Sequence, residues 1–248
     1  MKFKTPTQYT SLFVISALLF GALGCSESGT SESTAVDASR ALSRQVRIET
    51  SFGDMIVELS DSTPAHRDNF VKLASEGFYD SLLFHRVIKG FMVQGGDPNS
   101  RGASLSQRLG MGGPGYTVPA EIRTDHLHFK GALSAARQGD QANPQRASSG
   151  SQFYVVHGRK FNEAELLNIE ARASRANEQF NQNQIFEYSE EDMRRYMEEG
   201  GAPFLDNQYT VFGQVISGLD IIDSIAAVQT GAGDRPMQDV PMTMEVIR

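Results

Sequence analysis

Hydrophobic and polar positions alternate in short runs along much of the chain, a pattern that predicts many short strands. Residues 46–50 alternate, residues 51–54 supply turn formers, and residues 55–59 alternate again, so the folded part is expected to begin with a hairpin. Further strands are predicted over 130–136, 151–156, 209–216 and 242–247. Many short strands with few helices predict a mainly β protein built on a closed antiparallel barrel.

Three other stretches have the apolar spacing of helices. In the first, Thr63 is expected at the N-cap, Pro64 at the first helical position, and Gly77 just beyond the end. The second covers about 160–201 and carries two capping-box patterns, so it is expected to form a helical pair. The third, 218–227, is a shorter amphipathic helix. The two capping boxes are Asn162-x-x-Glu165 and Ser189-x-x-Asp192.

Residues 1–24 have the pattern of a secretory signal. Lys2 and Lys4 precede an uncharged apolar run, 11–23, which is shorter than the ~20 residues that comfortably span a bilayer. Cys25 is the only cysteine and follows small residues directly. This segment resembles the lipobox of bacterial lipoproteins, in which the cysteine is acylated and becomes the mature N-terminus. The alternatives are a soluble secreted protein or an uncleaved anchor.

Residues 25–44 are rich in Ser and Thr with little to bury, which predicts a disordered tether ahead of a folded domain at 45–248. Loss of the two signal lysines would leave 21 of the 23 basic residues against 30 acidic ones, a net charge of −9. Nucleic acid is therefore not an expected partner, because phosphate binding needs a basic face. We expect a monomer in the bacterial cell envelope, held at the periplasmic face or outer membrane by its lipid alone.

The most distinctive stretch, 84–98, combines one fixed cation and one amide with large apolar side chains. Its alternation predicts two short strands that are interrupted near Gly90, and Gly95-Gly96-Asp97-Pro98 predicts a turn. The guanidinium of Arg86 does not deprotonate in proteins, so an apolar site with this single donor is unsuited to hydrolysis. It suits a reaction in which no covalent bond is made or broken.

Two other features could be taken for ligand sites. Residues 110–115 are glycine-rich, but a phosphate loop needs a preceding strand and a following helix with Lys-Ser/Thr, so a surface loop is predicted. His126 and His128 form the only close histidine pair and have no cysteine near them in the sequence. A solvated loop is the better interpretation, and neither a metal nor a cofactor is expected.

Four separated blocks of sequence resemble the cyclophilins, which are peptidyl-prolyl cis/trans isomerases. The blocks are Phe84-His85-Arg86-Val87-Ile88 with Phe91-Met92-Val93-Gln94-Gly95-Gly96-Asp97, then Gly150-Ser151-Gln152-Phe153-Tyr154, then Phe204-Leu205-Asp206, then Val211-Phe212-Gly213. The resemblance covers 45–248 apart from the inserted helices, which are similar to those of some bacterial members. It implies an eight-stranded closed antiparallel β-barrel capped by two α-helices, with the active groove on an outer face.

The implied reaction is rotation about X-Pro peptide bonds in unfolded or partly folded polypeptides, with no covalent intermediate. Rotation crosses a barrier of ~18–20 kcal/mol. At the twisted transition state the lone pair returns to the prolyl nitrogen, so a donor to that nitrogen stabilises the twisted state more than the planar one. By resemblance the donor is Arg86. In the cell envelope such an enzyme would assist protein folding.

The resemblance also implies the residues of the groove. Phe91, Met92, Phe153, Leu205 and Phe212 would line the proline pocket. The alternative for each apolar residue is ordinary barrel core, to which Phe84 and Phe212 are the most expected to contribute. Gln94 would bind the substrate backbone, and Ala136-Arg137 would hold the residues before the proline. His85 is expected to be a groove wall, because the reaction needs neither an acid nor a base. The implied substrate-binding set is His85, Phe91, Met92, Gln94, Ala136, Arg137, Gln152, Phe153, Phe204, Leu205, Tyr209 and Phe212.

Three positions depart from the commonest family pattern. Phe204 stands where many members have Trp, Tyr209 where they have His, and Arg137 where they have Asn. Phe204 lacks the indole N–H that contacts cyclosporin in sensitive members, so weaker inhibition by that drug is expected. Tyr209 keeps a flat ring at the pocket rim, so catalysis should survive. Arg137 adds positive charge beside the substrate's N-terminal side and is expected to favour acidic residues there.

Two functions from other classes stay open on the sequence. One is a surface-tethered chaperone or adaptor whose groove binds chains without turnover, although Arg86, Gln94 and Phe153 argue against pure binding. The other is a hydrolase, for which no serine or cysteine nucleophile has an evident base partner in the sequence.

Overall fold

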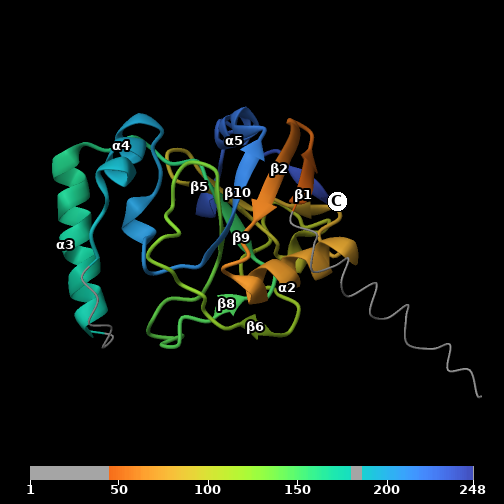
Figure 1. Ribbon diagram of the computed structural model, residues 1–248. Coiled ribbons are helices and arrows are strands. Elements are labelled where there is room, and N and C mark those ends of the chain that lie inside the picture. Colours follow the sequence, from red (N-terminus) through yellow and green to blue (C-terminus); the bar gives the residue numbers. More distant parts are fainter. Residues whose placement is uncertain (1–44, 180–185, 248) are drawn as a thin grey trace, which may run out of the picture.

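The computed structural model describes residues 45–179 and 186–247 (Figure 1). The predicted signal segment, Cys25 and the tether lie outside the described residues. The strands are β1 Gln45–Thr50, β2 Gly53–Leu59, β3 Leu82–Leu83, β4 Arg86–Ile88, β5 Met92–Gly95, β6 Thr117–Val118, β7 Ala132–Ala135, β8 Ser148–Ser149, β9 Phe153–Val156, β10 Val211–Ser217 and β11 Pro241–Ile247. The helices are α2 Pro64–Ser75, α3 Glu163–Gln179, α4 Glu190–Glu198 and α5 Leu219–Ala226, with short 3-10 turns η1 Pro98–Ser100, η2 Pro203–Leu205 and η3 Ala232–Asp234. Within the two described ranges, no helix is both long and apolar enough to cross a membrane.

Nine strands form one antiparallel sheet in the order β3-β11-β1-β2-β10-β7-β9-β5-β4, and β6 pairs separately with β8. The predicted closed eight-stranded barrel is therefore corrected to a curled nine-stranded sheet that is open between its edge strands, as far as the described residues go. Only Phe84 and His85 separate those two edges along the chain. The Phe84 amide donates to Val240 O beside β11 at 2.9 Å, and the His85 amide donates to Gln94 O in β5 at 3.0 Å. Phe84 thus pairs with the β11 side and His85 with the β5 side, so this segment passes from one edge strand to the other without joining them by hydrogen bonds.

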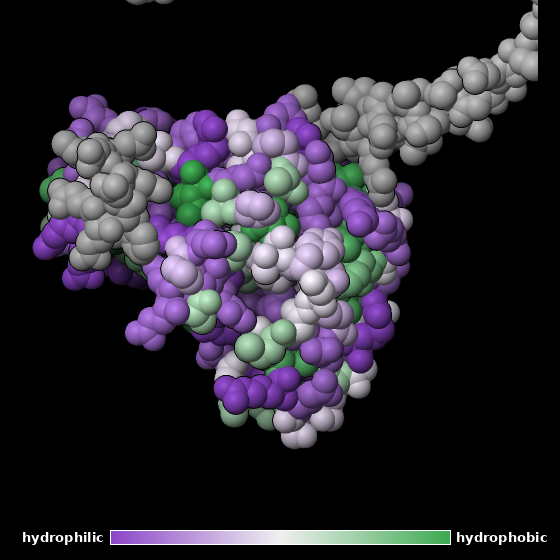
Figure 2. Space-filling view, turned by 90° about the horizontal axis from the view of Figure 1, so that it is seen from below, coloured by the Kyte–Doolittle hydropathy of each residue, from purple (hydrophilic) through white to green (hydrophobic). Residues whose placement is uncertain are grey.

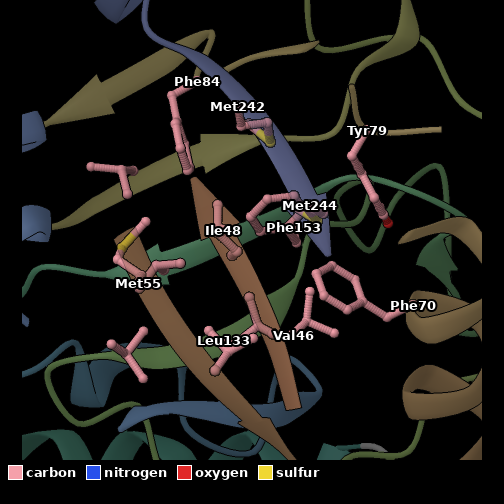
Figure 3. Close-up of a cluster of buried hydrophobic side chains, with 14 of the residues drawn as sticks. Val46, Ile48, Met55, Phe70, Tyr79, Phe84, Leu133, Phe153, Met242 and Met244 are labelled. Carbon is pink, nitrogen blue, oxygen red and sulfur yellow. The ribbon is translucent and has the colours of Figure 1, made fainter. Parts of the chain in front are cut away.

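The main core is formed by the strands of the sheet and the helices α2 and α5. Figure 3 shows strand residues of this core together with Phe70 of α2. Phe70 of α2 and Ile222 and Ile225 of α5 are fully or almost fully buried against the inward side chains of the strands. Figure 3 shows Phe70 beside Phe153 and Val46. The two predicted capping helices are confirmed, as is the predicted hairpin of β1 and β2.

The residue that caps the start of α2 is not the predicted one. Thr63 occupies the N-cap position and Pro64 the first helical position, but the Thr63 side chain makes no capping hydrogen bond. Glu121, which lies far along the chain, does the capping instead. Its carboxylate accepts from the amides of Ala65 at 3.0 Å and His66 at 2.9 Å, and it also contacts His66 Nδ1 at 2.7 Å. A negative charge at a helix N-terminus stabilises the helix through both hydrogen bonds and dipole.

Replacing Glu121 by alanine is expected to lower the free energy of unfolding by about 1–2 kcal/mol, because two helix amides and a buried imidazole lose their acceptor. Urea denaturation would measure the loss. Glu58→Ala is the matched control, since Glu58 is exposed on β2 and the described residues give its carboxylate no hydrogen-bond partner. Equal effects of the two substitutions would contradict the capping role.

The predicted helical pair is confirmed as α3 and α4, which lie together at one side of the molecule (Figure 1). Both capping boxes form: Glu165 N donates to Asn162 Oδ1 at 3.0 Å, and the Ser189 and Asp192 side chains cap reciprocally. The two ends of the insertion meet in an antiparallel bridge between Arg159 and Gly201. Leu166, Phe186 and Tyr196 of the insertion form an apolar cluster together with Leu127 and Phe129, which precede β7.

Candidate active groove

Strand register aligns one row of residues across the sheet, and the side chains of this row share the outer face. Arg86 on β4 stands opposite Gln94 on β5, which stands opposite Tyr154 on β9, which stands opposite Ser134 on β7. Ser134 in turn stands opposite Val211 on β10. Residues directly opposite on neighbouring strands point to the same face of a sheet. The predicted cation and the predicted amide are therefore brought to one face by strand register.

A chain of polar contacts fixes the amides beside Arg86. Arg86 Nη1 lies 3.5 Å from Gln94 Oε1, Gln94 Nε2 donates to Gln152 Oε1 at 3.2 Å, and Gln152 Nε2 donates to Gly112 O at 2.7 Å. The glycine-rich loop at 110–115 thus anchors this chain. Asp97 anchors the loop, because its carboxylate accepts from the amides of Gly110 at 2.5 Å and Gly112 at 3.3 Å.

Arg86 has a second contact, to Asp234, that was not predicted from the sequence. Asp234 Oδ2 accepts from Arg86 Nε at 3.2 Å, across 148 positions of the chain. Asp234 adopts a left-handed backbone with φ of 60°, as does Gly233 before it with φ of 69°. Asp tolerates this conformation better than most residues, and the resulting turn brings the carboxylate to the guanidinium. The Arg86 side chain is still 42% exposed, so part of it stays accessible on the outer face of the sheet.

A cluster of apolar side chains lies beside this polar row. Met92 and Tyr154 are buried in it, and Phe91, Leu205 and Tyr209 pack against them. The Phe204 ring lies 5.3 Å from the Phe91 ring and is 44% exposed. Met92 lies two residues before Gln94 on β5. Because alternate residues of a strand point to the same face, Met92 shares the outer face with Gln94. Of the predicted proline-pocket residues, Phe91, Met92 and Leu205 are brought together here.

Two predicted pocket residues lie elsewhere. Phe153 and Phe212 belong to the main core: Phe153 packs edge-on against Phe70 and Phe84, and Phe212 packs against Phe70. The physical reason is the period of two along a strand, which turns Phe153 inward when Tyr154 faces outward with Gln94. Tyr154 takes the pocket position that was predicted for Phe153. All four residues of β9 are apolar and buried, so alternation in the sequence could not show which of Phe153 and Tyr154 faces outward.

Arg137 and Ala136 line the groove near Gln152, but the guanidinium of Arg137 is already paired with groups of the protein itself. Its guanidinium contacts Asp140 Oδ1 at 2.5 Å, donates to Gln208 O at 2.9 Å and stacks over the Tyr209 ring at 4.4 Å. Its side chain is only 3% exposed. The expectation that Arg137 favours acidic substrate residues is therefore corrected: the cation holds Tyr209 and the 206–209 segment in place.

A hollow of about 660 Å³ continues from Gln94 along the outer face. It lies between the glycine-rich loop and the segment from Ala136 to Gln145, and Gln152 and Ser149 are also in its lining. The glycine-rich loop is thus a surface loop, as predicted, and forms one wall of this hollow. An extended peptide whose proline sat beside Met92 would continue along it.

His85 lies behind the groove and is only 4% exposed. Burial lowers the pKa of its imidazole to about 4, and the nearby Arg235 and Arg86 act in the same direction while Asp97 opposes them. The ring is therefore neutral near pH 7. Its predicted place as a groove wall is corrected to a support beneath the surface, near Gly110.

The two histidines considered for a metal site have separate surroundings. His126 contacts Ser60 and Asp125, whereas His128 contacts Asp206 and Tyr154. Among the described residues no three potential ligands come together to hold a metal. His128 is fully buried, so the predicted solvated loop is wrong for that residue.

The comparisons with known proteins agree with this geometry. The family model for the cyclophilin type peptidyl-prolyl cis-trans isomerase/CLD matches residues 45–246. A Staphylococcus haemolyticus protein named for peptidyl-prolyl cis-trans isomerase activity is 35% identical over 202 residues, which cover 79% of this chain and 87% of that one. A Streptococcus pyogenes protein named for phosphatase and isomerase activities is 35% identical over 219 residues, but this chain spans only 38% of its length. The cyclophilin type isomerase of Cryptosporidium parvum has the same fold, with a TM-score of 0.55 at 23% identity over 83% of this chain and 98% of that chain.

A curled antiparallel sheet with a hollow, an apolar cluster and an arginine on its outer face is the arrangement of a cyclophilin-like protein. The chain belongs to the cyclophilin-type peptidyl-prolyl cis-trans isomerases and is therefore an isomerase.

Proposed function

We propose that this chain rotates X-Pro peptide bonds in the groove beside Arg86 and that it does so on proteins folding in the cell envelope. The observation that carries the first part is the position of Arg86, whose partly exposed guanidinium is held by Gln94 and Asp234 on the same face of the sheet as an apolar cluster that includes Met92 and Leu205. Of its five N–H groups, two make these contacts, and the others are available to a substrate.

The chemistry follows from this placement. A proline ring against Met92, Leu205 and Phe91 would put the prolyl nitrogen near the guanidinium. As the amide twists, that nitrogen regains its lone pair and becomes an acceptor, so the hydrogen bond from Arg86 strengthens on the way to the transition state. Five powers of ten in rate correspond to about 7 kcal/mol of such differential stabilisation. No proton is transferred, which agrees with the neutral and buried His85.

The residues before the proline would lie along Ala136 and Arg137. The backbone amide and carbonyl of Ala136 pair with Gln152 and Ser149. In the described part of the chain, the backbone of Arg137 has no such partner, so it can pair with an extended substrate. The side-chain amide of Gln94 lines the same hollow as Ala136 and Arg137, so it can also bind the substrate backbone. A relative's structure determined in the presence of the dipeptide Ala-Pro supports an X-Pro ligand for this groove.

The envelope location rests on the N-terminal pattern alone. Acylation of Cys25 would tether the enzyme to a membrane, and residues 25–44 would hold the groove away from the lipid surface. The test is the Cys25→Ser variant expressed in a bacterial host. We expect the wild-type protein to sediment with membranes and the variant to stay in the soluble fraction; equal partition would contradict lipid anchoring.

The isomerase proposal is tested by two-dimensional exchange NMR on a short Ala-Pro peptide. Uncatalysed exchange takes tens to hundreds of seconds, so exchange cross-peaks within a second or less show catalysis. We expect such cross-peaks with the 45–248 fragment at micromolar concentration. Peptide binding without accelerated exchange would favour the tethered chaperone instead. On the described part of the face in Figure 2, apolar residues lie in small groups among hydrophilic ones, so that face offers no broad surface for unfolded chains.

Cyclosporin is expected to inhibit the enzyme weakly, because Phe204 cannot supply the N–H donor that sensitive members have. Phe204→Trp should restore the donor at the same exposed position and lower the inhibition constant by about tenfold, the effect of one hydrogen bond of roughly 1.4 kcal/mol. The measurement is inhibition of the exchange rate. A nanomolar inhibition constant for the wild-type protein would contradict the prediction.

A further inference from the structure

The inserted helices reach the active groove through one buried carboxylate. Asp206 follows η2 and its side chain is fully buried. Its Oδ2 accepts from the hydroxyl of Tyr188 at 2.7 Å and from that of Tyr196 at 2.7 Å. Its Oδ1 accepts from the amide of His128 at 2.8 Å and lies 2.8 Å from His128 Nδ1. A buried carboxylate is tolerated only when it is fully satisfied, and here four donors satisfy it.

Both tyrosines belong to the insertion, whereas Asp206 and His128 belong to the curled sheet and its loops. Burial, followed by the negative charge of Asp206, raises the pKa of both Tyr188 and Tyr196, so each hydroxyl keeps its proton and donates it. The chain leaving the insertion also contacts His128, since the amide of Ala202, next to Gly201, donates to His128 O at 2.8 Å. Two charge-assisted hydrogen bonds therefore join the insertion to Asp206, in addition to the apolar packing of Tyr196 against Phe129.

The same carboxylate controls two parts of the proline pocket. Asp206 comes directly after Phe204 and Leu205, so its position fixes the turn that carries this wall. The His128 ring carries the contact onward, since its Nδ1 lies 2.8 Å from Asp206 Oδ1 and its Nε2 lies 3.1 Å from the Tyr154 hydroxyl, within hydrogen-bond distance of both. This hydrogen bond directs the Tyr154 hydroxyl away from the substrate and leaves its ring in the pocket.

We propose that Tyr188 and Tyr196 are positioning residues for the isomerase groove, acting through Asp206 and His128 on the 204–205 wall and on Tyr154. The inference deepens the proposed function and rests on it. Without the two hydroxyls, Asp206 Oδ2 would remain buried without a donor from the insertion. The turn after Ala202 would then shift to recover a partner, and the pocket would lose its fixed width.

The test compares the full chain with the double variant Tyr188→Phe and Tyr196→Phe. We expect the double variant to unfold cooperatively and to raise KM for an Ala-Pro peptide by about tenfold, with kcat changed by less than about threefold, because the donor Arg86 is untouched. Methyl NMR signals of Met92 and Leu205 should shift as well. This second readout needs no catalysis, so it separates a failure of the inference from a failure of the proposed function.

The matched control is Tyr79→Phe, which also removes one buried hydroxyl, in this case one that contacts Ser151 O at 3.3 Å in the main core. It should lower stability without altering KM or the Met92 and Leu205 signals. If the double variant does not fold, Tyr188→Phe and Tyr196→Phe are tested singly, since each leaves one hydroxyl on Asp206. KM and pocket signals that match those of Tyr79→Phe would overturn the inference.

Discussion

Replacing Arg86 by alanine is expected to lower kcat/KM for cis/trans exchange by about 100-fold or more, with the fold unchanged. Removal of one preorganised donor to a developing charge commonly costs a factor of 10²–10³ in rate, or about 2.7–4 kcal/mol. Arg86 is half exposed on a short strand, so its loss removes no core contact. The measurement is the exchange rate at several peptide concentrations, so that kcat and KM are separated.

Arg86→Lys is the informative companion to this variant. Lysine keeps the charge but not the fork that contacts Asp234 through Nε and Gln94 through Nη1. We expect it to recover only a small part of the lost rate, because a single ammonium cannot hold both contacts and also donate to the prolyl nitrogen. A fall of less than tenfold for Arg86→Ala would show that another group supplies most of the transition-state stabilisation.

The elements of this fold were largely predictable because the local patterns agree with the final structure. The alternating runs became strands, both capping boxes formed, and Gly77 ends α2 with φ of 66°. These features depend on residues three or four positions apart, so the sequence contains them directly. Closure of the sheet was not predictable in this way, since it depends on how Phe84 and His85 divide their amides between two distant partners.

The site was predictable in part. Arg86, Gln94, Met92 and Leu205 came from the family resemblance, and the structure brings them together. The register of β9 against β5 decides between Phe153 and Tyr154, and matching blocks of letters do not reveal a one-residue shift of face. Arg137 lies where it was predicted, but its predicted role in attracting acidic substrate residues was wrong. Its pairing with Asp140 could not be inferred from the sequence.

The buried network around Asp206 was the least predictable feature. Its carboxylate gathers donors from residues 10, 18 and 78 positions away, and no periodic pattern links them. Its existence changes how the insertion can be studied. Deleting 160–201 to isolate a chaperone role would also remove Tyr188 and Tyr196 from Asp206, so a loss of exchange in the deletion would not separate the two roles. The single hydroxyl deletions avoid that difficulty.

Acid is expected to destabilise the protein through His85. Burial holds the pKa of this imidazole at about 4 in the folded state, against 6.5 as the ordinary value. Because the folded pKa is the lower one, the unfolded chain takes up the proton first. The free energy of unfolding should therefore decline as pH falls below about 6.5, and the decline should be complete below about pH 4. The difference of about 2.5 pKa units corresponds to a loss of about 3 kcal/mol.

His85→Gln removes this titration and leaves the other acid-sensitive groups in place, including His66, whose pKa burial also lowers. The two proteins should be compared by urea denaturation between pH 7 and pH 3.5. We expect the wild-type protein to lose about 3 kcal/mol more than the variant over this range, with the divergence beginning near pH 6.5. Parallel stability curves would show that the pKa of His85 is the same in the folded and unfolded states and would contradict the prediction. At pH 5 to 7 the exchange rate of the wild-type enzyme should not follow a histidine titration, because His85 stays neutral behind the groove while Arg86 keeps its charge.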